Sequence, residues 1–551
     1  MIRTLTYLSL GLLMLSYWPD SYAQAPSQSP MQIEAQSLTE LMEQRLKGIA
    51  ESAKPRLRNE AIFAPGTLRD FYTARGFRPI WINSADGRAR SIWLLASIRE
   101  AEDDGLLPQD YHFMEISNLY RSNGQNPDEL MDLELLMTDA HFLLASHLYF
   151  GKTNPESIKA EWNIKRTKAE INLAERLAQD LANNALWQSL DFYRPSMSAY
   201  AALRQKLRFY RLRLITLPWE PLPFERKLEA GDSHAHMHTI RQRLIALGDL
   251  AAYQVSDSLH YDENLLAGLK RFQRRHGLHP DGVIGPNTLS AINSTPAERM
   301  QSTLANLERL RWLPDDMADE RVEVNIASFE MHYVNGLDTL ISSRAVVGRP
   351  YRRSPVFYAE MDHIVFSPTW TVPPGIMRND VLPAVRKNQG YLAEKNMVVL
   401  DSHGRAVNPS QVDWFKSPFP YTIRQNPGPQ NALGQAKFMF PNSYAVYIHD
   451  TPSRELFDRE ERAFSSGCIR ISKPREFAEV LLRDREEWDS DKIRAAMQSN
   501  REQRVNLRSK VPVYLLYFTA WASEEGVHFR KDIYNRDAPL LQALQTPRPS
   551  Y

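Results

Sequence analysis

The hydrophobic pattern of this chain changes its period near Arg321, and that change divides the sequence into two kinds of structure. Before it, apolar residues recur at i, i+3 and i+4 spacing, as in Leu133 to Phe150, which is typical of amphipathic helices. After it, Val322, Val324 and Ile326 alternate with other residues, which is typical of half-buried strands. The sequence therefore predicts a multidomain α+β protein, helical at first and β-rich later.

Length and charge limit the classes of protein to which the chain can belong. Its 551 residues are enough for about two to four domains. Its 67 basic and 66 acidic residues give a net charge of +1. Nucleic-acid binding needs a basic surface that this balance does not provide, so we expect no nucleic-acid partner.

The N-terminus has the features of a cleavable signal peptide. Arg3 supplies a positive charge, Leu5 to Trp18 form an apolar run, and Ser21-Tyr22-Ala23 is a small-x-small cleavage site. The apolar run is shorter than the roughly 20 residues that cross a bilayer. We therefore expect residues 1–23 to be removed after export; if left uncleaved, they would anchor the protein to the membrane.

Cys468 is the only cysteine in the chain, so no internal disulfide can form. A lone cysteine is often a small buried hydrophobe, but a thiolate beside a base is a strong nucleophile. His449 ends the strand-like run Tyr444 to Ile448 and could be that base. Gly467 gives the backbone freedom before Cys468, so the amides of both residues could stabilise an oxyanion.

Three neighbours complete this candidate thiol site. Tyr447 lies two residues before His449, hence on the same strand face, where its hydroxyl could donate a hydrogen bond; ordinary core packing is the alternative. Arg470 could bind a substrate carboxylate or form a structural ion pair. Ser466 is expected to shape the loop beside the substrate.

A compact three-helix unit is predicted from His238 to about Asn293. Gly248 is a suitable residue to end its first helix, and Asp262 to open its second. The string from Phe272 to Thr288, with Gly277-Leu278, Asp281-Gly282 and Ile284-Gly285, closely resembles the small peptidoglycan-binding domain. The alternative is a spacer bundle with no ligand affinity.

The string His449-Asp450-Thr451, followed by Ser465-Ser466-Gly467-Cys468-Ile469-Arg470, resembles the signature of the L,D-transpeptidases. These cysteine enzymes cross-link bacterial peptidoglycan. The family usually has Gly after the first His and often His before Gly-Cys. This chain has Asp450 and Ser466 there, as the large multidomain branch of the family tolerates.

The resemblance implies a reaction and its participants. Cys468 would attack the third residue of a tetrapeptide stem and expel D-alanine, and an amine of a second stem would resolve the thioester as a 3→3 cross-link. His449 would be the base, oriented by the main-chain carbonyl of Asp450 or, alternatively, by its side chain. No metal or organic cofactor is implied. The expected partners are stem peptides, glycan strands and other cell-wall synthesis enzymes, and carbapenems would be inhibitors.

The resemblance also implies a domain plan with an inserted lid over the catalytic cleft. Trp414 lies in that insert, where an exposed ring could hold a sugar-peptide strand, or a buried one could form a minor core. The plan is a signal peptide (1–23), a polar leader (24–36), a mainly helical scaffold domain (37–231), a peptidoglycan-binding domain (232–295), a helical connector (296–320), a β-rich L,D-transpeptidase catalytic domain (321–537, lid about 377–438) and a C-terminal tail (538–551).

His234, His236 and His238 alternate near the start of the three-helix unit. On one strand face they could bind a metal ion, but no carboxylate or cysteine follows at a familiar ligand spacing. We therefore interpret this segment as a solvated linker and expect no metal site.

Three rival functions remain open at this point. An L,D-carboxypeptidase would let water resolve the same thioester. An enzyme that attaches an outer-membrane protein to stem peptides would use a protein amine. A non-catalytic wall-binding scaffold would have no need of a lone thiol outside the cytoplasm.

Overall fold

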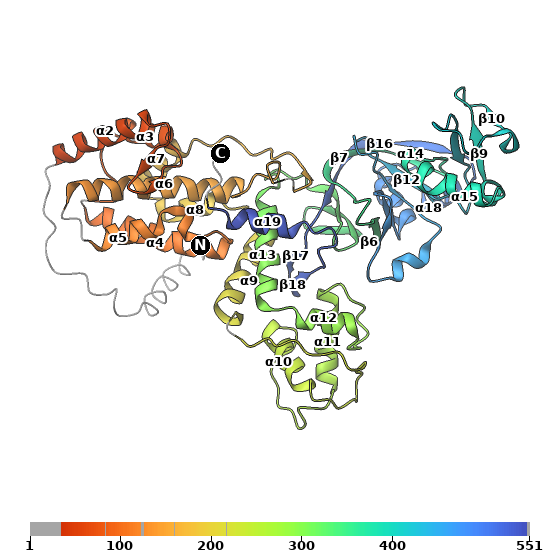
Figure 1. Ribbon diagram of the computed structural model, residues 1–551, viewed down its shortest axis with the longest axis horizontal. Helices are drawn as coiled ribbons and strands as arrows, with labels where there is room; N and C mark the ends of the chain where they lie inside the picture. Colours follow the sequence, from red (N-terminus) through yellow and green to blue (C-terminus); the bar gives the residue numbers. More distant parts are fainter. Residues whose placement is uncertain (1–34, 83, 123–125, 159, 216, 548–551) are drawn as a thin grey trace. The chain divides into compact units, whose positions relative to one another are not determined.

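The computed structural model describes residues 35–82, 84–122, 126–158, 160–215 and 217–547 (Figure 1). The predicted signal peptide, most of the polar leader and the last four residues of the predicted tail lie outside these ranges. The chain forms two compact units. The first comprises residues up to Arg99 with Tyr111–Leu143 and Asn172–Trp187, and the second comprises Glu100–Asp110, Leu144–Ile171 and Gln188–Tyr551.

The first unit is helical, as predicted. Its elements are α2 (Ala35–Glu51), β1 (Arg56–Leu57), β2 (Glu60–Ala61), α3 (Pro65–Ala74), α4 (Ala85–Glu100), α5 (Phe113–Arg121), most of α6 (Pro127–Phe150), α7 (Leu173–Ala182) and η5 (Leu186–Gln188). A buried carboxylate on α6, Glu134, accepts the amides of Ile80 (2.6 Å) and Trp81 (2.9 Å). Burial raises the pKa of Glu134 to about 7, and these hydrogen bonds oppose that rise.

The second unit contains helices on either side of its three-helix part. They are η3 (Ala101–Asp104), η4 (Pro108–Tyr111), α8 (Ser189–Phe192), α9 (Ser198–Phe209), the π-helix η6 (Tyr210–Leu214), α13 (Pro296–Arg311) and α19 (Asp537–Gln545). The predicted connector is α13, which starts with a capping box of Thr295 and Glu298. The predicted tail is largely the helix α19, because Leu540 and Leu544 are buried in the core.

The three-helix unit forms as predicted. It consists of α10 (Met237–Leu247), α11 (Glu263–Arg275) and α12 (Pro286–Asn293). Gly248 ends α10 at a φ of 83°, in the left-handed region that glycine adopts without strain. The Asp262 side chain caps α11 by accepting the Leu265 amide at 2.8 Å. The core of this unit includes Ile240, Leu244, Leu265, Leu269, Phe272, Ile284, Leu289 and Ile292.

The β-rich domain is built on one large sheet. Its strands are β3 (Trp162–Asn163), β4 (Glu320–Asn325), β5 (Glu330–Asn335), β6 (Asp338–Gly348), β7 (Val356–Phe366), β12 (Ala436–Met439), β13 (Ile448–His449), β14 (Ala463–Ser465), β15 (Ile469–Ile471) and β16 (Gln503–Leu516). The order is β12-β13-β15-β6-β5-β4-β16-β7-β3, with β14 beside β6. Because β7 also pairs with β12, the sheet closes on itself. The sequence did not predict β3, because this strand lies in the region predicted to be mainly helical.

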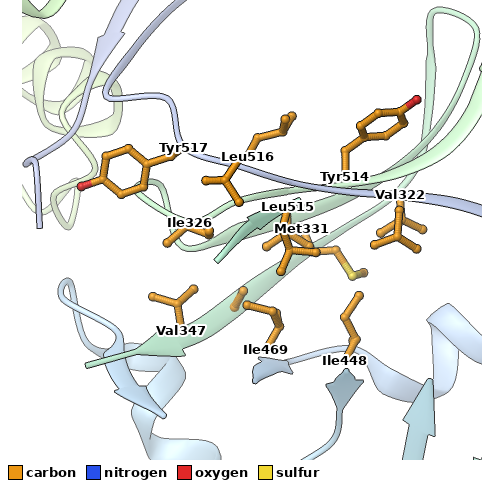
Figure 2. Close-up of a cluster of buried hydrophobic side chains, with 14 of the residues drawn as sticks. Val322, Ile326, Met331, Val347, Ile448, Ile469, Tyr514, Leu515, Leu516 and Tyr517 are labelled. Atoms are coloured by element: carbon orange, nitrogen blue, oxygen red, sulfur yellow. The ribbon is translucent and has the colours of Figure 1, made fainter. Parts of the chain in front are cut away.

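The core of this sheet is continuous from β4 to β15. Figure 2 shows Val322 and Met331 from β4 and β5 facing Ile448 and Ile469. Ile448 and Ile469 are completely buried, and they are the residues immediately after Tyr447 and Cys468. Alternation along a strand therefore turns Tyr447, His449, Cys468 and Arg470 to the opposite face.

The C-terminal hairpin is separate from the large sheet. β17 (Ala520–Ser523) pairs only with β18 (Gly526–Phe529), in a separate two-stranded sheet. The large sheet is closed instead by β7 and β12. The remaining elements of the domain are η9 (Arg454–Asp458), α17 (Pro474–Leu481) and α18 (Ser490–Gln498).

The insert has a sheet and a core of its own. Its elements are β8 (Trp370–Thr371), α14 (Pro374–Ile376), η7 (Met377–Val381), α15 (Leu382–Lys387), α16 (Tyr391–Glu394), β9 (Met397–Leu400), β10 (Ala406–Val407), η8 (Pro409–Gln411) and β11 (Thr422–Gln425). The strand order is β10-β9-β11-β8. The insert therefore begins earlier than residue 377, and it ends before β12, which belongs to the large sheet.

No helix in the described ranges has both the length and the apolar character needed to cross a membrane.

Candidate active site

Three adjacent strands hold the candidate thiol site. β13 pairs in parallel with β15, which places His449 opposite Arg470. It pairs antiparallel with β12, which places His449 also opposite Lys437. The Ile469 amide donates to the Tyr447 carbonyl at 3.1 Å, so Cys468 and Tyr447 lie side by side at the start of this pairing. Because paired residues share a face, these side chains meet on the face opposite the core.

The strand that carries His449 is shorter than the sequence pattern suggested. Only Ile448 and His449 have strand geometry, and Ala445 has a φ of 53°. The side chain of Asn442 explains this, because its Oδ1 accepts the amides of Tyr444 (3.0 Å) and Val446. Those hydrogen bonds hold a turn where the alternating apolar pattern predicted a strand.

His449 is buried and its ring orientation is fixed. Its Nδ1 lies 2.5 Å from the carbonyl oxygen of Asp450. A carbonyl only accepts, so Nδ1 carries the proton and Nε2 keeps its lone pair. The pKa of His449 is lowered to about 3. Burial is the main cause, and the charges of Arg470 and Lys437 lower it further. The ring is therefore a neutral base at physiological pH.

The carboxylate of Asp450 has other partners. Its Oδ2 accepts the Gln435 amide at 2.9 Å, and its Oδ1 accepts Nη1 of Arg454 at 3.0 Å. Gly434 lies so close that an added Cβ would meet the Asp450 Cγ at 2.4 Å. Of the two orienting groups considered for His449, the geometry favours the main-chain carbonyl.

The loop before Cys468 is held by its own hydrogen bonds. Gly467 has a φ of 117°, a conformation that glycine adopts without strain. Its amide donates to Ser465 Oγ at 3.0 Å, and that hydroxyl donates to the Cys468 carbonyl at 2.6 Å. The Gly467 amide is thus already engaged, which leaves the Cys468 amide as the better placed of the two oxyanion donors that we nominated.

Cys468 is partly buried, and its Sγ lies 3.8 Å from the carbonyl of Ala445. Burial raises the pKa of this thiol, while hydrogen bonds from Tyr447 and then the charges of Lys437 and Arg470 lower it. Burial and then the Cys468 thiolate raise the pKa of Tyr447, so its hydroxyl stays protonated beside the sulfur. This contact supports Tyr447 as a hydrogen-bond donor of the site.

The guanidinium of Arg470 is not fully hydrogen-bonded within the described residues. Its Nε is buried without a hydrogen-bond partner among the residues that the structure describes. Burial lowers the pKa of Arg470, and the Cys468 thiolate opposes that shift. A structural ion pair would satisfy this guanidinium, so the geometry favours a role in binding an anionic group.

Ser466 is exposed at the rim of the site and linked to the insert. Its Oγ accepts Nη1 of Arg352 at 2.9 Å, and the same nitrogen donates to Asp380 of η7 at 2.8 Å. Arg352 therefore joins the loop before Cys468 to the insert. The sequence analysis did not single out Arg352 or Asp380, because the 85 residues between Asp380 and Ser466 hide their proximity.

Lys437 was also missed by the sequence analysis. It lies between Ala436 and Phe438, which are completely buried, so the period of two turns Lys437 to the face of His449. Its Nζ lies 4.2 Å from the centroid of the Tyr447 ring. The alternation was visible in the sequence, but the register that places Lys437 opposite His449 was not.

Of the two alternatives for Trp414, the structure supports the buried ring. Trp414 is 7% exposed and packs in the insert's own core, stacked on Phe419 with ring centroids 5.7 Å apart. The neighbouring Phe415 is 75% exposed and carries the guanidinium of Arg386 at 5.0 Å. Trp414 is therefore too buried to contact a glycan strand, whereas the exposed ring of Phe415 is accessible to one.

The alternating histidines do not line a strand. His238 lies in α10, while His234 and His236 converge on Glu225, with potential ligand atoms within 4.8 Å of one another. His234 Nδ1 accepts the His236 amide at 3.2 Å, which puts the ring proton on Nε2, 3.2 Å from Glu225 Oε2.

Comparison with known proteins finds matches to three domain families. Residues 319–498 match the L,D-transpeptidase catalytic domain, residues 233–292 a peptidoglycan binding domain, and residues 66–207 a scaffold domain. A Haemophilus influenzae protein named "Putative L,D-transpeptidase" is 37% identical over 242 residues, which are 44% of this chain. The chain spans about half the length of that relative (49%).

This chain is also similar to an L,D-transpeptidase from Xylanimonas cellulosilytica with a known crystal structure, at 15% sequence identity. The match covers 53% of this chain and 99% of the crystallised chain. Its TM-score of 0.16 is too low to bear on the fold. From the family matches, this chain carries an L,D-transpeptidase catalytic domain together with a peptidoglycan-binding domain, as its sequence strings indicated.

Proposed function

We propose that this protein is a peptidoglycan L,D-transpeptidase that forms 3→3 cross-links through a thioester on Cys468. The observation that carries the proposal is the register of β12, β13 and β15. It gathers the only thiol, a neutral imidazole and two cations on one face of a domain that matches this family. Acyl transfer by a thiol needs this combination of nucleophile, base and charge stabilisation.

Acylation would begin with transfer of the Cys468 proton to Nε2 of His449. The sulfur attacks the carbonyl carbon of the third stem residue, and the Cys468 amide and Tyr447 hydroxyl stabilise the oxyanion. As the tetrahedral intermediate collapses, the peptide bond to D-alanine breaks and the imidazolium returns its proton to the departing amine. Free D-alanine and a thioester remain.

Resolution would repeat these steps with a new nucleophile. The side-chain amine of a second stem attacks the thioester carbonyl, His449 accepts the amine proton, and the C–S bond breaks. The proton then returns to the sulfur, which restores the thiol and leaves a 3→3 amide bond. Arg470, whose buried Nε lacks a partner among the described residues, would bind a carboxylate of the donor stem.

The proposed setting is the periplasm. Both domain matches concern peptidoglycan, which lies outside the cytoplasm, and the N-terminal pattern fits a signal peptide. The peptidoglycan-binding domain would hold the enzyme on its polymeric substrate. Other cell-wall synthesis enzymes are its proposed partners, and carbapenems its proposed acylating inhibitors.

The experiment is incubation of the purified mature protein with disaccharide-tetrapeptides, beside a Cys468→Ala control. Products are analysed by mass spectrometry. A dimer with the mass of two stems less one D-alanine, absent with the control, is the expected result. Tripeptide alone would instead identify an L,D-carboxypeptidase, and transfer only to a protein amine would identify an attachment enzyme. Wall binding without turnover would favour a non-catalytic scaffold.

A further inference from the structure

We infer that Lys437 is a positioning residue of the thiol site, a cation that β12 holds over the Tyr447 ring to stabilise the thiolate of Cys468. The inference rests on the proposed role of Cys468 as nucleophile. It assigns to β12 a function beyond closing the sheet.

The first argument is the alignment of three side chains across three strands. Lys437 on β12 is the register partner of His449, and His449 is in turn the partner of Arg470 on β15. Neighbouring strands lie about 4.8 Å apart, so the imidazole has a cation on each side. The antiparallel pairing of β12 with β7, with Lys437 opposite Val365, fixes Lys437 from its other edge.

The second argument is the state of the ammonium group. Lys437 is half-buried, and its Nζ lies 4.2 Å from the centre of the Tyr447 ring. Among the described residues, no carboxylate lies within salt-bridge distance of it; Glu502 acts on its charge, but its Oε2 accepts the Thr369 amide at 2.6 Å. Partial burial of an unpaired cation is unfavourable, and an apolar residue would pack there without that penalty.

The third argument is the direction of its effects. After the hydrogen bonds from Tyr447, Lys437 is the largest of the cationic influences that lower the pKa of Cys468, ahead of Arg470. The same charge lowers the pKa of His449. Lys437 thus favours the charged form of the nucleophile and the neutral form of the base, the two states that proton transfer and attack require.

The test uses Cys468 as its own reporter. Because Cys468 is the only cysteine, the part of iodoacetamide alkylation that a Cys468→Ala variant of the full mature chain lacks reports this thiol. The alkylation rate is measured from pH 6 to 11 by intact-protein mass spectrometry for the wild type, Lys437→Met, Lys437→Gln and Lys437→Arg. Lys395→Met, at an exposed lysine of the insert, is the matched control.

We expect Lys437→Met and Lys437→Gln to raise the midpoint of the pH profile by about one unit, because the thiolate loses a neighbouring cation. A shift of one unit is a tenfold change in the ionisation equilibrium. Lys437→Arg should restore most of the wild-type midpoint, and Lys395→Met should leave it unchanged. If Lys437→Met unfolds, as judged by near-ultraviolet circular dichroism, the Gln and Arg variants decide the comparison.

An unchanged midpoint in a folded Lys437→Met or Lys437→Gln variant would overturn the inference. So would a higher KM for stem peptide with an unchanged alkylation profile, because Lys437 would then bind substrate rather than stabilise the thiolate. Alkylation needs no peptidoglycan, so its outcome is independent of whether the proposed transpeptidation is observed.

Discussion

Nδ1 of His449 is hydrogen-bonded at 2.5 Å to the carbonyl oxygen of the next residue, Asp450. The carbonyl of the next residue thereby fixes the tautomer of the candidate base, with the proton on Nδ1 and the lone pair on Nε2. The Asp450 carboxylate instead holds the surrounding backbone through Gln435 and Arg454. Orientation of the base and support of its loop are therefore separate tasks of one residue.

This separation predicts that Asp450→Asn keeps most of the catalytic activity. The carbonyl that orients His449 is unchanged, so we expect the acylation rate to fall less than about tenfold, whereas His449→Gln should lower it by about 10²–10⁴-fold. The lost charge-assisted hydrogen bonds should destabilise the protein by about 1–3 kcal/mol. Single-turnover acylation and thermal unfolding measure the two effects. A fall in rate as large as that of His449→Gln would show that the carboxylate orients the ring.

Gly434 is predicted to be essential for the position of Asp450. Its φ is 63°, and an added Cβ would lie 2.4 Å from the Asp450 carboxylate. Gly434→Ala should therefore destabilise the protein by about 2–4 kcal/mol, from backbone strain and overpacking together. It should also slow acylation by displacing the carbonyl that orients His449.

Gly404→Ala is the matched control for this prediction. Gly404 has a φ of 78° but no atom within 4 Å of its added Cβ, so this variant shares the strain and lacks the clash. Differential scanning calorimetry compares the two variants. Equal losses of stability would attribute the effect to backbone strain alone.

The buried imidazole predicts a pH dependence of stability. Burial lowers the pKa of His449 from 6.5 to about 3, so the unfolded chain binds this proton more readily than the folded one. The contribution of the neutral imidazole to the free energy of unfolding is complete above pH 6.5. It is lost as the pH falls toward 3, and the total loss is about 4–5 kcal/mol. Between pH 7 and pH 4, the unfolding temperature of the wild type should fall more steeply than that of His449→Gln. Parallel curves would contradict the lowered pKa.

Arg352 is predicted to couple the insert to the loop before the nucleophile. One of its nitrogens donates to both Asp380 and Ser466, so Arg352→Met removes both links. We expect amide hydrogen exchange to become several-fold faster in η7 and around Ser466, with little change in global stability, because exposed ion pairs contribute only about 0.2–1 kcal/mol. Arg378→Met, at an exposed arginine of the same π-helix, is the control and should leave exchange near Ser466 unchanged.

Local signals in the sequence predicted local structure well. Gly248 and Asp262 marked the end and start of helices because their conformational and capping preferences act within a few residues. The alternation around Val322 and Val324 likewise predicted β4. The string around Cys468 nominated the thiol and the candidate base through its resemblance to a family signature.

Nonlocal pairing could not be predicted in this way. The closure of the sheet by β7 and β12 joins strands separated by the whole insert, and nothing in either strand specifies the other. Lys437 was consequently not singled out in the sequence, although its pairing places it opposite His449. Asn442 had the opposite effect, since its side chain imposed a turn on a segment whose apolar pattern favoured a strand.

The insert offers the last test, because two adjacent aromatic residues have opposite environments. Trp414 is buried against Phe419, so Trp414→Ala should destabilise the insert by about 3–5 kcal/mol, with a loss of cooperative unfolding there. Phe415 is exposed, so Phe415→Ala should leave the unfolding temperature within about a degree of the wild type. If the exposed ring contacts glycan strands, Phe415→Ala should raise KM for polymeric peptidoglycan several-fold and leave KM for a free stem peptide unchanged, since aromatic contacts contribute about 0.5–1.5 kcal/mol. If Phe415→Ala has the same KM as the wild type for polymeric peptidoglycan and for the free stem peptide, the exposed ring plays no part in binding the polymer.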